Sequence, residues 1–392
     1  MRVWIENPFD NLPVEGYRPQ RYWLMAEAFA RAGHDAVLWT ADFNHTTKAK
    51  RALSCEVART FALELVEEPP YASNVSIGRM YSHYRYSRAW ERRALEYAAD
   101  HGAPDVIIAS TPPLSACAAA RRLARRFGAK VVVDVMDAWP ETFERVAPKW
   151  ALWPLRRVAK ANYLGADLIT VVADRYIDLV RGYGYKGEVS RFYHGIDLGE
   201  APSRVHPEGL ALAYVGNLGR TYDLKTVVRA IAELPRATLD IAGRGEGEEP
   251  LRRLVEELGL GERVRFRGYL GEGEMGAMLS GCNVGIVPMA ADSFVGVPYK
   301  FCDYAKASLA IVSSLGGESA KLLAKYSAGA LYRPSDPASL ARALNSLDPA
   351  ACGAAARRMA EAELSSSSIY SAYVNCVVGR LWSGARFCAG AG

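Results

Sequence analysis

A lysine and an aspartate lie three residues apart behind a proline that can begin a helix. In the segment Pro298-Tyr-Lys-Phe-Cys-Asp303, the proline suits the first turn and a loop containing Gly296 precedes it. A carboxylate at Asp303 can accept hydrogen bonds from both hydroxyls of a ribose, while the free N–H groups of the helix start and Lys300 attract a diphosphate. The same residues also fit a capped surface helix with a solvated acid and base, so the residues alone leave both interpretations open.

Two glycine-rich turns follow predicted strands in the same half of the chain. Val215-Gly-Asn-Leu-Gly219 places Gly216 at a strand end and Arg220 just beyond the turn. Such a turn lets the backbone approach a phosphate, but glycine-rich turns are also common connections between a strand and a helix in α/β proteins. The second turn, Ala242-Gly-Arg-Gly-Glu-Gly247, has the spacing G-x-G-x-G and not G-x-G-x-x-G, which disfavours a nicotinamide dinucleotide. Arg244 in this turn either binds phosphate or is solvated.

The elements that must position these residues follow an α/β pattern, in which short apolar runs alternate with longer amphipathic segments. In the first half the predicted strands are Met1–Ile5, Ala36–Thr40, Val106–Ser110, Lys130–Val135, Asp167–Val172 and Val189–Tyr193. The predicted helices there are Gln20–Ala32, Leu114–Phe127, Leu155–Leu164 and Arg175–Gly182. Near-continuous Val and Ile indicate strands buried on both faces, as in a doubly wound parallel sheet.

A second series of elements begins after the polar stretch Asp197–Gly209, which is typical of a linker. Its predicted strands are Leu210–Val215, Ala237–Ala242, Arg263–Arg267, Val284–Pro288, Ala310–Ser313 and Ala328–Tyr332. Its predicted helices are Leu224–Glu233, Glu249–Leu258, Glu272–Ser280, Tyr299–Ala307 and Ala338–Ser346, and Pro349 to about Gly379 is expected to form terminal helices. We expect Rossmann-like domains at 1–200 and 201–365, with a helix and tail at 366–392 that return toward the first domain. Two such domains facing a cleft suit an enzyme with two substrates.

The composition limits the class of protein. The chain has 392 residues, 48 Lys and Arg, 43 Asp and Glu, and 50% hydrophobic residues, which are globular values. Seven cysteines without a C-x-x-C pair argue against a zinc site or disulfide framework and favour a reducing cytoplasm. No apolar run approaches the roughly 18 residues of a membrane span, and Met1–Phe9 lacks the apolar core of a signal peptide. We expect a protein that is neither membrane-integral nor exported.

Seven segments, in order and spacing, resemble the retaining glycosyltransferases of family 4, which have the GT-B fold and transfer sugars from nucleotide-sugar donors. The segments are Ala32-Gly-His34, Asp137-Ala-Trp-Pro-Glu141, Tyr193-His-Gly-Ile-Asp197, Val215-Gly-Asn-Leu-Gly219, Ile241-Ala-Gly-Arg-Gly245, Val264-Arg-Phe-Arg-Gly268 and Pro298-Tyr-Lys-Phe-Cys-Asp-Tyr-Ala305. The resemblance covers nearly the whole chain. The second and last segments are most similar to the bacterial branch that builds surface polysaccharides on lipid carriers.

This resemblance implies roles for residues of the second domain. Asp303 takes the second acidic position of the family's E-x7-E motif, which holds the donor ribose. The first position falls on Val295, so Asp292 is a nearby substitute, or the backbone of Gly296 and Val297 contacts the donor sugar and phosphate instead.

Two further positions depart from the family. Its phosphate-binding Arg and Lys fall at about Asn217 and Tyr222, which leaves Arg220, Arg244 and Lys300 as candidates for the diphosphate. The base would be read by the backbone of Gly268, Tyr269 and Leu270. His194 and Gly195 replace the Asn-Gly of the junction, and we interpret them as structural.

The implied reaction retains the anomeric configuration without a metal. The chain has neither D-x-D nor H-E-x-x-H, so the leaving diphosphate would be stabilised by N–H groups and by Arg and Lys. The acceptor hydroxyl would attack the face from which the diphosphate leaves, with a leaving-group oxygen as base. Asp137 is the candidate to orient the donor sugar or the acceptor hydroxyl, and a structural cap before Trp-Pro is the alternative.

The acceptor is expected to meet two loops of the first domain. Gly16, Tyr17 and Arg18 follow the first strand, where the loop is expected to face the donor phosphate. The loop Phe43–Arg51 offers the basic side chains His45, Lys48, Lys50 and Arg51, which can meet the pyrophosphate of a polyprenyl-linked acceptor. A solvated basic loop is the alternative.

Basic residues also concentrate in three runs of the first domain, Arg79–Arg93, Arg121–Lys130 and Arg145–Lys160. Tyrosines lie in the first run, and Trp150 and Trp153 lie in the third. Basic and aromatic side chains together suit an anionic bilayer surface. No nucleic-acid recognition module is evident, so we expect no nucleic-acid partner. The runs predict peripheral attachment to the inner face of the cytoplasmic membrane, although solvated helix faces would explain any one of them.

Together the residues and the resemblance predict a cytoplasmic glycosyltransferase with a nucleotide sugar as co-substrate and no bound cofactor. It would move a hexosyl or N-acetylhexosaminyl group from a UDP-sugar to a lipid-linked polyprenyl-diphosphate or glycan acceptor in bacterial surface polysaccharide synthesis. Three alternatives stay open: a GDP-sugar donor, a nucleotide-sugar epimerase, and a non-catalytic subunit that binds a nucleotide sugar. The non-catalytic alternative is motivated by two departures from the family: the first acidic residue of the E-x7-E motif is missing, and the phosphate-binding Arg and Lys are replaced.

Overall fold

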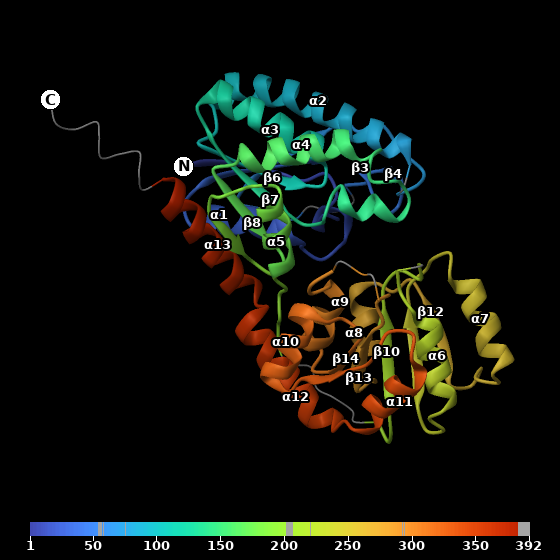
Figure 1. The fold of residues 1–392 in the computed structure, drawn as a ribbon. Helices are drawn as coiled ribbons and strands as arrows, with labels where there is room; N and C mark the ends of the chain where they lie inside the picture. Colours follow the sequence, from blue (N-terminus) through green and yellow to red (C-terminus); the bar gives the residue numbers. More distant parts are fainter. Residues whose placement is uncertain are drawn as a thin grey trace. The chain divides into compact units, whose positions relative to one another are not determined.

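The computed structural model of the chain describes residues 1–53, 57, 59–74, 76–200, 207–219, 221–291, 293 and 295–382. By their contacts these residues form two compact units (Figure 1). Unit 1 contains Met1–Gly195 and the chain from Ser366 onward, and unit 2 contains Ile196–Ser365.

Unit 1 is built on a seven-stranded parallel sheet in the order β5-β2-β1-β6-β7-β8-β9. Its strands are β1 (Arg2–Glu6), β2 (Asp35–Ala41), β5 (Ala62–Val66), β6 (Val106–Thr111), β7 (Lys130–Val135), β8 (Leu168–Val171) and β9 (Val189–Arg191). The central strands are buried on both faces, as their Val- and Ile-rich runs predict.

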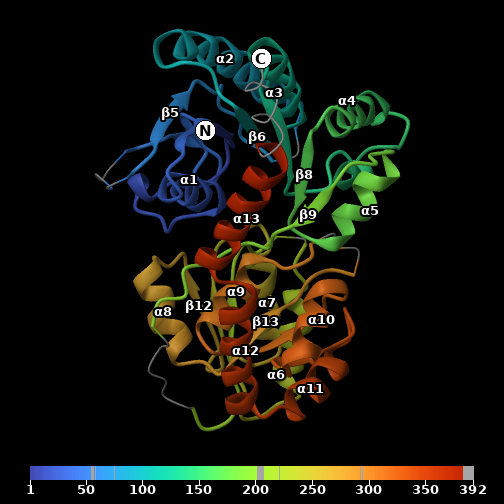
Figure 2. The ribbon, with the colours of Figure 1, turned by 90° about the vertical axis from the view of Figure 1, so that its left-hand side faces the viewer.

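Helices cover both faces of this sheet. The helices α2 (Ile77–His101), α3 (Leu114–Phe127) and α4 (Trp153–Leu164) lie along one face, and α5 (Asp174–Gly182) follows β8. On the other face the last helix, α13 (Ser366–Leu381), packs beside α1 (Arg21–Arg31), as both views show (Figures 1 and 2). Tyr370, Tyr373 and Val377 of α13 are therefore part of the core of unit 1.

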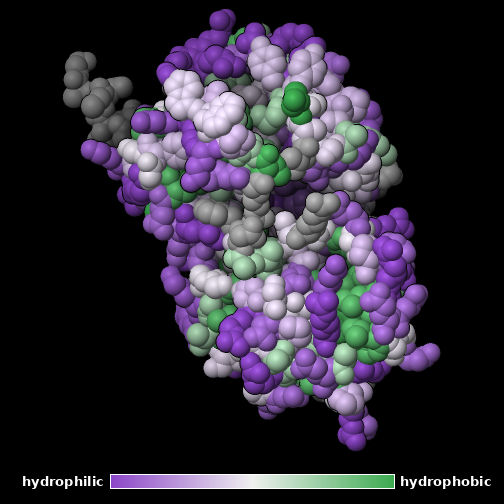
Figure 3. All heavy atoms as spheres, turned by 45° about the vertical axis from the view of Figure 1, so that its right-hand side comes forward, coloured by the Kyte–Doolittle hydropathy of each residue, from purple (hydrophilic) through white to green (hydrophobic). Residues whose placement is uncertain are grey.

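Unit 2 contains a six-stranded parallel sheet in the order β12-β11-β10-β13-β14-β15. Its strands are β10 (Ala211–Val215), β11 (Thr238–Ala242), β12 (Val264–Gly268), β13 (Val284–Val287), β14 (Ala310–Ser313) and β15 (Gly329–Leu331). The helices around it are α6 (Leu224–Ala232), α7 (Glu248–Glu257), α8 (Glu272–Ser280), α9 (Tyr299–Lys306), α10 (Gly317–Tyr326), α11 (Pro337–Asn345) and α12 (Pro349–Glu363). Apolar side chains of α6, α7 and α11 form one core with the sheet. On the face of the molecule shown in Figure 3, hydrophilic side chains predominate at the surface.

The α/β fold class is confirmed, and the predicted strands and helices are present with ends shifted by a few residues at most. Lys130–Val135 and Leu114–Phe127 begin and end where predicted. Five of the strands and α-helices in the described residues were not predicted from the sequence. They are the hairpin strands β3 (Phe43–Asn44) and β4 (Ala49–Lys50), the strand β5, and the helices α2 and α10. In α2 many basic residues obscure a buried stripe at helical spacing, which includes Tyr86, Trp90 and Tyr97.

A fully buried ion pair ties several of the elements of unit 1 together. Arg21 of α1 donates two hydrogen bonds of 2.8 Å to the carboxylate of Asp134 in β7, and both side chains are fully inaccessible. Asp134 also accepts hydrogen bonds from Tyr22 and Thr170, and Thr170 contacts the Tyr373 hydroxyl of α13 at 3.1 Å. Burial alone would raise the pKa of Asp134, but the Arg21 charge and these hydrogen bonds outweigh burial and lower it.

We expect Asp134→Ala to lower the free energy of unfolding by about 3–5 kcal/mol, because it leaves the Arg21 guanidinium buried without its counter-ion. Urea unfolding followed by circular dichroism measures the loss. The control is Glu96→Gln, which breaks the exposed pair Arg93–Glu96 (3.7 Å) and should cost about 0.5 kcal/mol or less. Equal losses in the two variants would contradict the scaffolding role of the buried pair.

Candidate functional site

The two glycine-rich turns of unit 2 lie against each other at the carboxyl edge of the sheet. The Gly216 N–H donates to the Ala242 carbonyl at 2.9 Å, and the Gly243 N–H donates to the Gly268 carbonyl at 2.7 Å. Gly243 has φ +140°, and a Cβ atom there would lie 1.8 Å from the Gly216 carbonyl oxygen. The ends of β10, β11 and β12 are thus joined so closely that a side chain at Gly243 has no room.

Lys300 of α9 reaches the turn after β10. A Cβ atom on Gly216 would lie 3.0 Å from Lys300 Nζ, so the ammonium group lies directly beside the backbone of this turn. Lys300 Nζ donates to the Tyr214 hydroxyl at 3.1 Å and lies 4.3 Å and 3.5 Å from the ring centroids of Tyr214 and Tyr222. Tyr214 in turn donates to the Asn217 carbonyl at 2.6 Å. Of the two positions that depart from the family, Tyr222 therefore contacts Lys300 directly, and Asn217 is linked to it through Tyr214.

The ammonium group of Lys300 is in an environment that disfavours its charge. The side chain is buried, and within the described residues no carboxylate lies at ion-pair distance from it. Burial lowers the pKa of Lys300 well below its usual value, while the charge of Asp303 acts in the opposite direction. An anion bound beside the turn would restore the charged form.

The other predicted residues of this region lie close to the start of α9. Asp303, three residues after Lys300 in α9, is buried at 6% exposure. Gly296 and Val297 are buried as well, and the Gly296 carbonyl accepts a hydrogen bond from the Ser319 hydroxyl. Val295, at the family's first acidic position, is 37% exposed, and its suggested substitute Asp292 lies outside the described residues.

The remaining candidates of unit 2 are more exposed. Arg244 is exposed, and its carbonyl accepts a hydrogen bond of 3.0 Å from the N–H of Leu218. Tyr269 is 58% exposed, and Leu270 lines an open hollow beside α8. Arg220 lies outside the described residues.

In unit 1, Asp137 follows β7. Its carboxylate accepts the N–H of Ala138 at 2.8 Å, and its own N–H donates to the Thr111 carbonyl at 3.3 Å. Its charge also raises the pKa of Arg79, although burial lowers that pKa more strongly. Asp137 therefore combines a local backbone contact with an electrostatic interaction at the carboxyl edge of the sheet.

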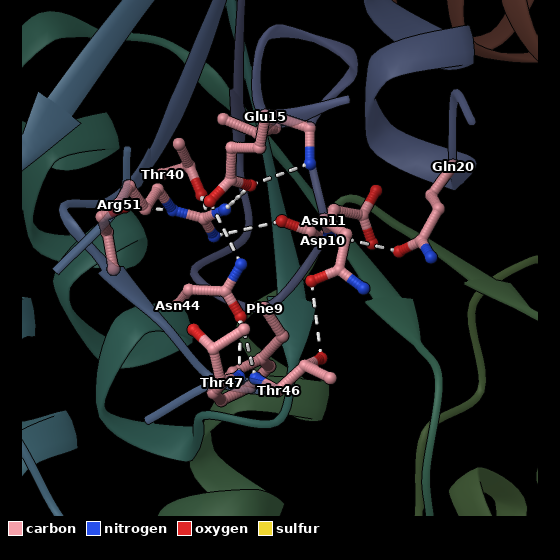
Figure 4. A network of polar contacts seen from close by, with 12 residues as sticks. Phe9, Asp10, Asn11, Glu15, Gln20, Thr40, Asn44, Thr46, Thr47 and Arg51 are labelled. Atoms are coloured by element: carbon pink, nitrogen blue, oxygen red, sulfur yellow. Dashed lines mark hydrogen bonds and ion pairs between the residues drawn. The ribbon is translucent and has the colours of Figure 1, made fainter. Parts of the chain in front are cut away.

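The loop after β1 is held by polar contacts with the loop after β2 (Figure 4). Gly16 ends a short turn with φ +84° and is exposed, whereas Tyr17 and Arg18 are partly buried. The inaccessible side chain of Arg51 pairs with Glu15 at 2.5 Å and donates to the carbonyls of Ala41, Pro8 and Asp10. The prediction that Arg51 meets an acceptor phosphate is wrong, because its donors hold these two loops together.

The other basic residues of the acceptor loop differ in their surroundings. Lys50 pairs with Asp42 at 2.5 Å. His45 contacts the Tyr71 hydroxyl through Nδ1, and Lys48 Nζ lies 3.4 Å from the same nitrogen. Burial, together with the charges of Arg79, Lys48 and Arg51, lowers the pKa of His45 to about 3, so His45 is neutral and does not serve as a cation.

Sequence reasoning missed several residues that contribute to these regions. Tyr214 is the penultimate residue of β10. Its position just before the glycine turn was the available sequence signal for its role. Arg79 was counted in a surface basic run, but it is half-buried in the first turn of α2 and donates to His83 Nε2 at 3.2 Å. The spacing of four between Arg79 and His83 was the available signal.

Within the described ranges no group of three or more His, Cys, Asp or Glu side chains is arranged to hold a metal ion. In the same ranges no helix is both long enough and apolar enough to cross a membrane.

Comparisons with known proteins match both units. The sequence model of "Glycosyltransferase Family 4" matches residues 21–200, and that of "Glycosyl transferases group 1" matches residues 182–361. No curated protein sequence matches the chain significantly.

Solved structures share the fold over the whole chain at low sequence identity. Sucrose-phosphate synthase from Thermosynechococcus elongatus is 16% identical with a TM-score of 0.74, covering 96% of this chain and 98% of its own. HepE from Anabaena in complex with UDP-glucose is 14% identical with a TM-score of 0.68, covering 97% and 99%. WaaG, a glycosyltransferase involved in lipopolysaccharide biosynthesis, is 15% identical with a TM-score of 0.66, covering 96% and 100%. The predicted GT-B fold is confirmed.

We expect Gly243→Ala to lower the free energy of unfolding by about 1–3 kcal/mol, because its Cβ would overlap the Gly216 carbonyl and force the two turns apart. The control Gly276→Ala in α8 has open space around the new methyl group and should be stabilising by about 0.5–1 kcal/mol. Melting temperatures of the three proteins provide the comparison. A Gly243→Ala protein as stable as the parent would show that the turns do not need their close approach.

Proposed function

Because the chain belongs to the group 1, family 4 glycosyltransferases, we propose that it transfers a sugar, with retention of configuration, from a UDP-sugar to a lipid-linked or glycan acceptor in surface polysaccharide synthesis. The lipid-linked acceptor would carry a polyprenyl diphosphate, and the transferred group would be a hexosyl or N-acetylhexosaminyl residue. The donor is a co-substrate, and the proposed reaction uses no metal or bound cofactor.

One observation supports the donor site: the buried amino group of Lys300 lies beside the Gly216 turn, without a carboxylate at ion-pair distance among the described residues. A buried cation without a carboxylate partner is costly unless a ligand supplies the negative charge. A diphosphate next to Gly216 would supply that charge. We assign the ribose hydroxyls to Asp303, which is on the same helix as Lys300.

The choice of uridine is supported by likeness and is part of the proposal. HepE, a structural neighbour, was solved with UDP-glucose, and WaaG acts in lipopolysaccharide biosynthesis. We assign the base to the backbone of Gly268, Tyr269 and Leu270, and the donor sugar to the backbone of Gly296 and Val297. Arg220 and Arg244 are further candidates for the diphosphate.

In the proposed step, the acceptor oxygen bonds to the anomeric carbon while the bond from that carbon to the diphosphate oxygen breaks on the same face. The proton of the acceptor hydroxyl passes to the leaving phosphate oxygen. Lys300 and the N–H groups of the turns stabilise the charge that develops on the diphosphate. Asp137 orients the donor sugar or the acceptor hydroxyl.

We expect UDP to raise the melting temperature of the protein selectively over GDP, ADP, CMP and NAD, since a ligand of the folded state stabilises it by mass action. Lys300→Met and Asp303→Ala should each weaken UDP binding about tenfold or more, the effect of losing one charge-assisted hydrogen bond. Calorimetry in buffers of different ionisation enthalpy should also detect proton uptake on binding, because the anion raises the lowered pKa of Lys300. Lys300→Met should abolish this uptake.

The matched control is Lys306→Met, which removes a more exposed lysine from the end of the same helix. A melting temperature that rises selectively with GDP would still support a transferase, but with a GDP-sugar as donor. A new nucleotide sugar formed from UDP-sugar alone would indicate an epimerase. Absence of any nucleotide shift at millimolar concentration would overturn the donor site and favour a non-catalytic subunit.

We also propose that unit 1 attaches peripherally to the inner face of the cytoplasmic membrane. The stretch before and along α4 exposes large apolar side chains, with Val146, Trp150 and Trp153 at 64%, 80% and 58% exposure. The exposed cations Lys149, Arg157 and Lys160 lie on the same stretch. Tryptophans flanked by cations match an anionic bilayer surface, where the rings enter the interface and the cations meet phosphate.

We expect the protein to float with vesicles containing anionic lipid, and much less with neutral vesicles. The double variant Trp150→Ser, Trp153→Ser should lose flotation because the interfacial rings are gone. Salt at about 0.5 M should weaken flotation by screening the cations. The control Leu331→Ser removes a 48% exposed apolar side chain from unit 2 and should leave flotation unchanged. Flotation of the double variant equal to that of the parent would exclude this surface.

A further inference from the structure

Two cations of unit 1 lie beside one aromatic ring. Lys48 Nζ is 4.4 Å from the Tyr71 ring centroid, and the guanidinium carbon of Arg79 is 5.9 Å from the same centroid. Their hydrogen-bond partners are neutral: Asn74 Oδ1 for Lys48, and the Asn74 carbonyl and His83 Nε2 for Arg79. In the part of the chain that the structure describes, neither cation has a carboxylate within ion-pair distance.

Aromatic rings form the walls around Arg79. Its guanidinium carbon lies 5.0 Å from the Trp139 ring centroid and 5.4 Å from that of Phe9. Phe9 also packs edge-on against His45 at 5.2 Å. These residues come from the loops after β1, β5 and β7, from the β3–β4 turn and from the first turn of α2, so several separate segments converge on one small region. We call Phe9, His45, Lys48, Tyr71, Arg79 and Trp139 the aromatic–cationic cluster.

The polar groups of the cluster are arranged as donors. Lys48 Nζ can only donate, and it lies 3.4 Å from His45 Nδ1. The neighbouring cations Lys50 and Arg51 are already paired with Asp42 and Glu15, so they do not compete for a ligand. The cluster therefore presents an ammonium and a guanidinium, both of which suit an anionic oxygen ligand.

Charge and burial favour an anion over a neutral ligand here. Burial lowers the pKa of Lys48 to about 8, and the charge of Arg79 contributes to this lowering, while Glu68 acts in the opposite direction. Bringing two like charges together in a half-buried region costs free energy that a phosphate would recover. Flat aromatic walls next to the cations would contact the apolar face of a sugar or an isoprene unit next to that phosphate.

We propose that the aromatic–cationic cluster binds a phosphate group of the acceptor, with Lys48 and Arg79 as the residues that select a phosphorylated acceptor over a neutral one. This inference rests on the proposed transfer reaction and names the acceptor class of that reaction. The phosphate can come from a lipid diphosphate or from a sugar phosphate. The two sources share the same chemistry at the cations and differ in the group that is attached to the phosphate.

Calorimetric titration of the full chain, with saturating UDP to fill the donor site, tests the cluster. The probes are farnesyl diphosphate, inorganic pyrophosphate and glucose 6-phosphate, with methyl glucoside as the neutral comparison. We expect the phosphate probes to bind and methyl glucoside not to bind. Arg79→Gln and Lys48→Gln should each weaken binding about tenfold or more, the effect of losing one charge-assisted hydrogen bond.

The matched control is Arg85→Gln, which removes another arginine from α2 whose guanidinium contacts the exposed Tyr81 and not the cluster. UDP affinity and melting temperature report whether each variant is folded. Lys48 lies on a partly exposed turn, so Lys48→Gln provides the test even if Arg79→Gln is unstable.

Tighter binding of farnesyl diphosphate than of pyrophosphate would support the proposal with a lipid source, and tightest binding of glucose 6-phosphate would support it with a sugar phosphate. Two outcomes would overturn the proposed role of the cluster: phosphate probes that bind equally to the parent and to both variants, or phosphate probes that do not bind while UDP does. Neither outcome would contradict the proposed transferase activity. If UDP does not bind, the same titration without nucleotide still tests the cluster, and the donor site is what has failed.

Discussion

All strands of the seven-stranded and six-stranded sheets run parallel, and this constraint determines where chemistry can occur in each unit. A parallel sheet is covered by helices on both faces, so its body accepts mostly apolar side chains. The loops that follow the strands all emerge at one edge, where backbone N–H groups and polar side chains can meet a ligand. The Gly216 and Gly243 turns in unit 2 and the aromatic–cationic cluster in unit 1 both lie at such an edge.

Buried charges in the molecule are of two kinds. Arg21 with Asp134, and Arg51 with Glu15, are inaccessible pairs whose hydrogen bonds join separate elements and position the loops around them. Lys300, Lys48 and Arg79 are instead wholly or partly buried beside aromatic rings, with no carboxylate at ion-pair distance among the described residues. Because an uncompensated buried charge is costly, the first kind supports the fold and the second kind favours an external anion.

Much of the fold could be predicted because periodicity is a local property of the chain. Val- and Ile-rich runs such as Lys130–Val135 predicted buried strands, and glycines after apolar helices marked where those helices end. The prediction of secondary structure failed where charged side chains interrupt the apolar periodicity. In α2 the buried stripe is interrupted by arginines, and β5 is a half-buried edge strand with Glu64 at its centre. An element with one solvated face and many charges gives a weak apolar signal.

The sequence by itself determined the α/β class and the positions of the glycine turns and of Lys300 and Asp303, because these depend on residue type and on spacing along the chain. Only the tertiary structure decided which charges are already compensated. Arg51 and Lys48 are three residues apart in one basic loop, yet the first is held by Glu15 and three carbonyls while the second lies on Tyr71. Arg79 reaches Lys48 only because β2, β5 and α2 fold together. Partners distant in sequence set the burial and electrostatic environment of a side chain, and local spacing contains no record of them.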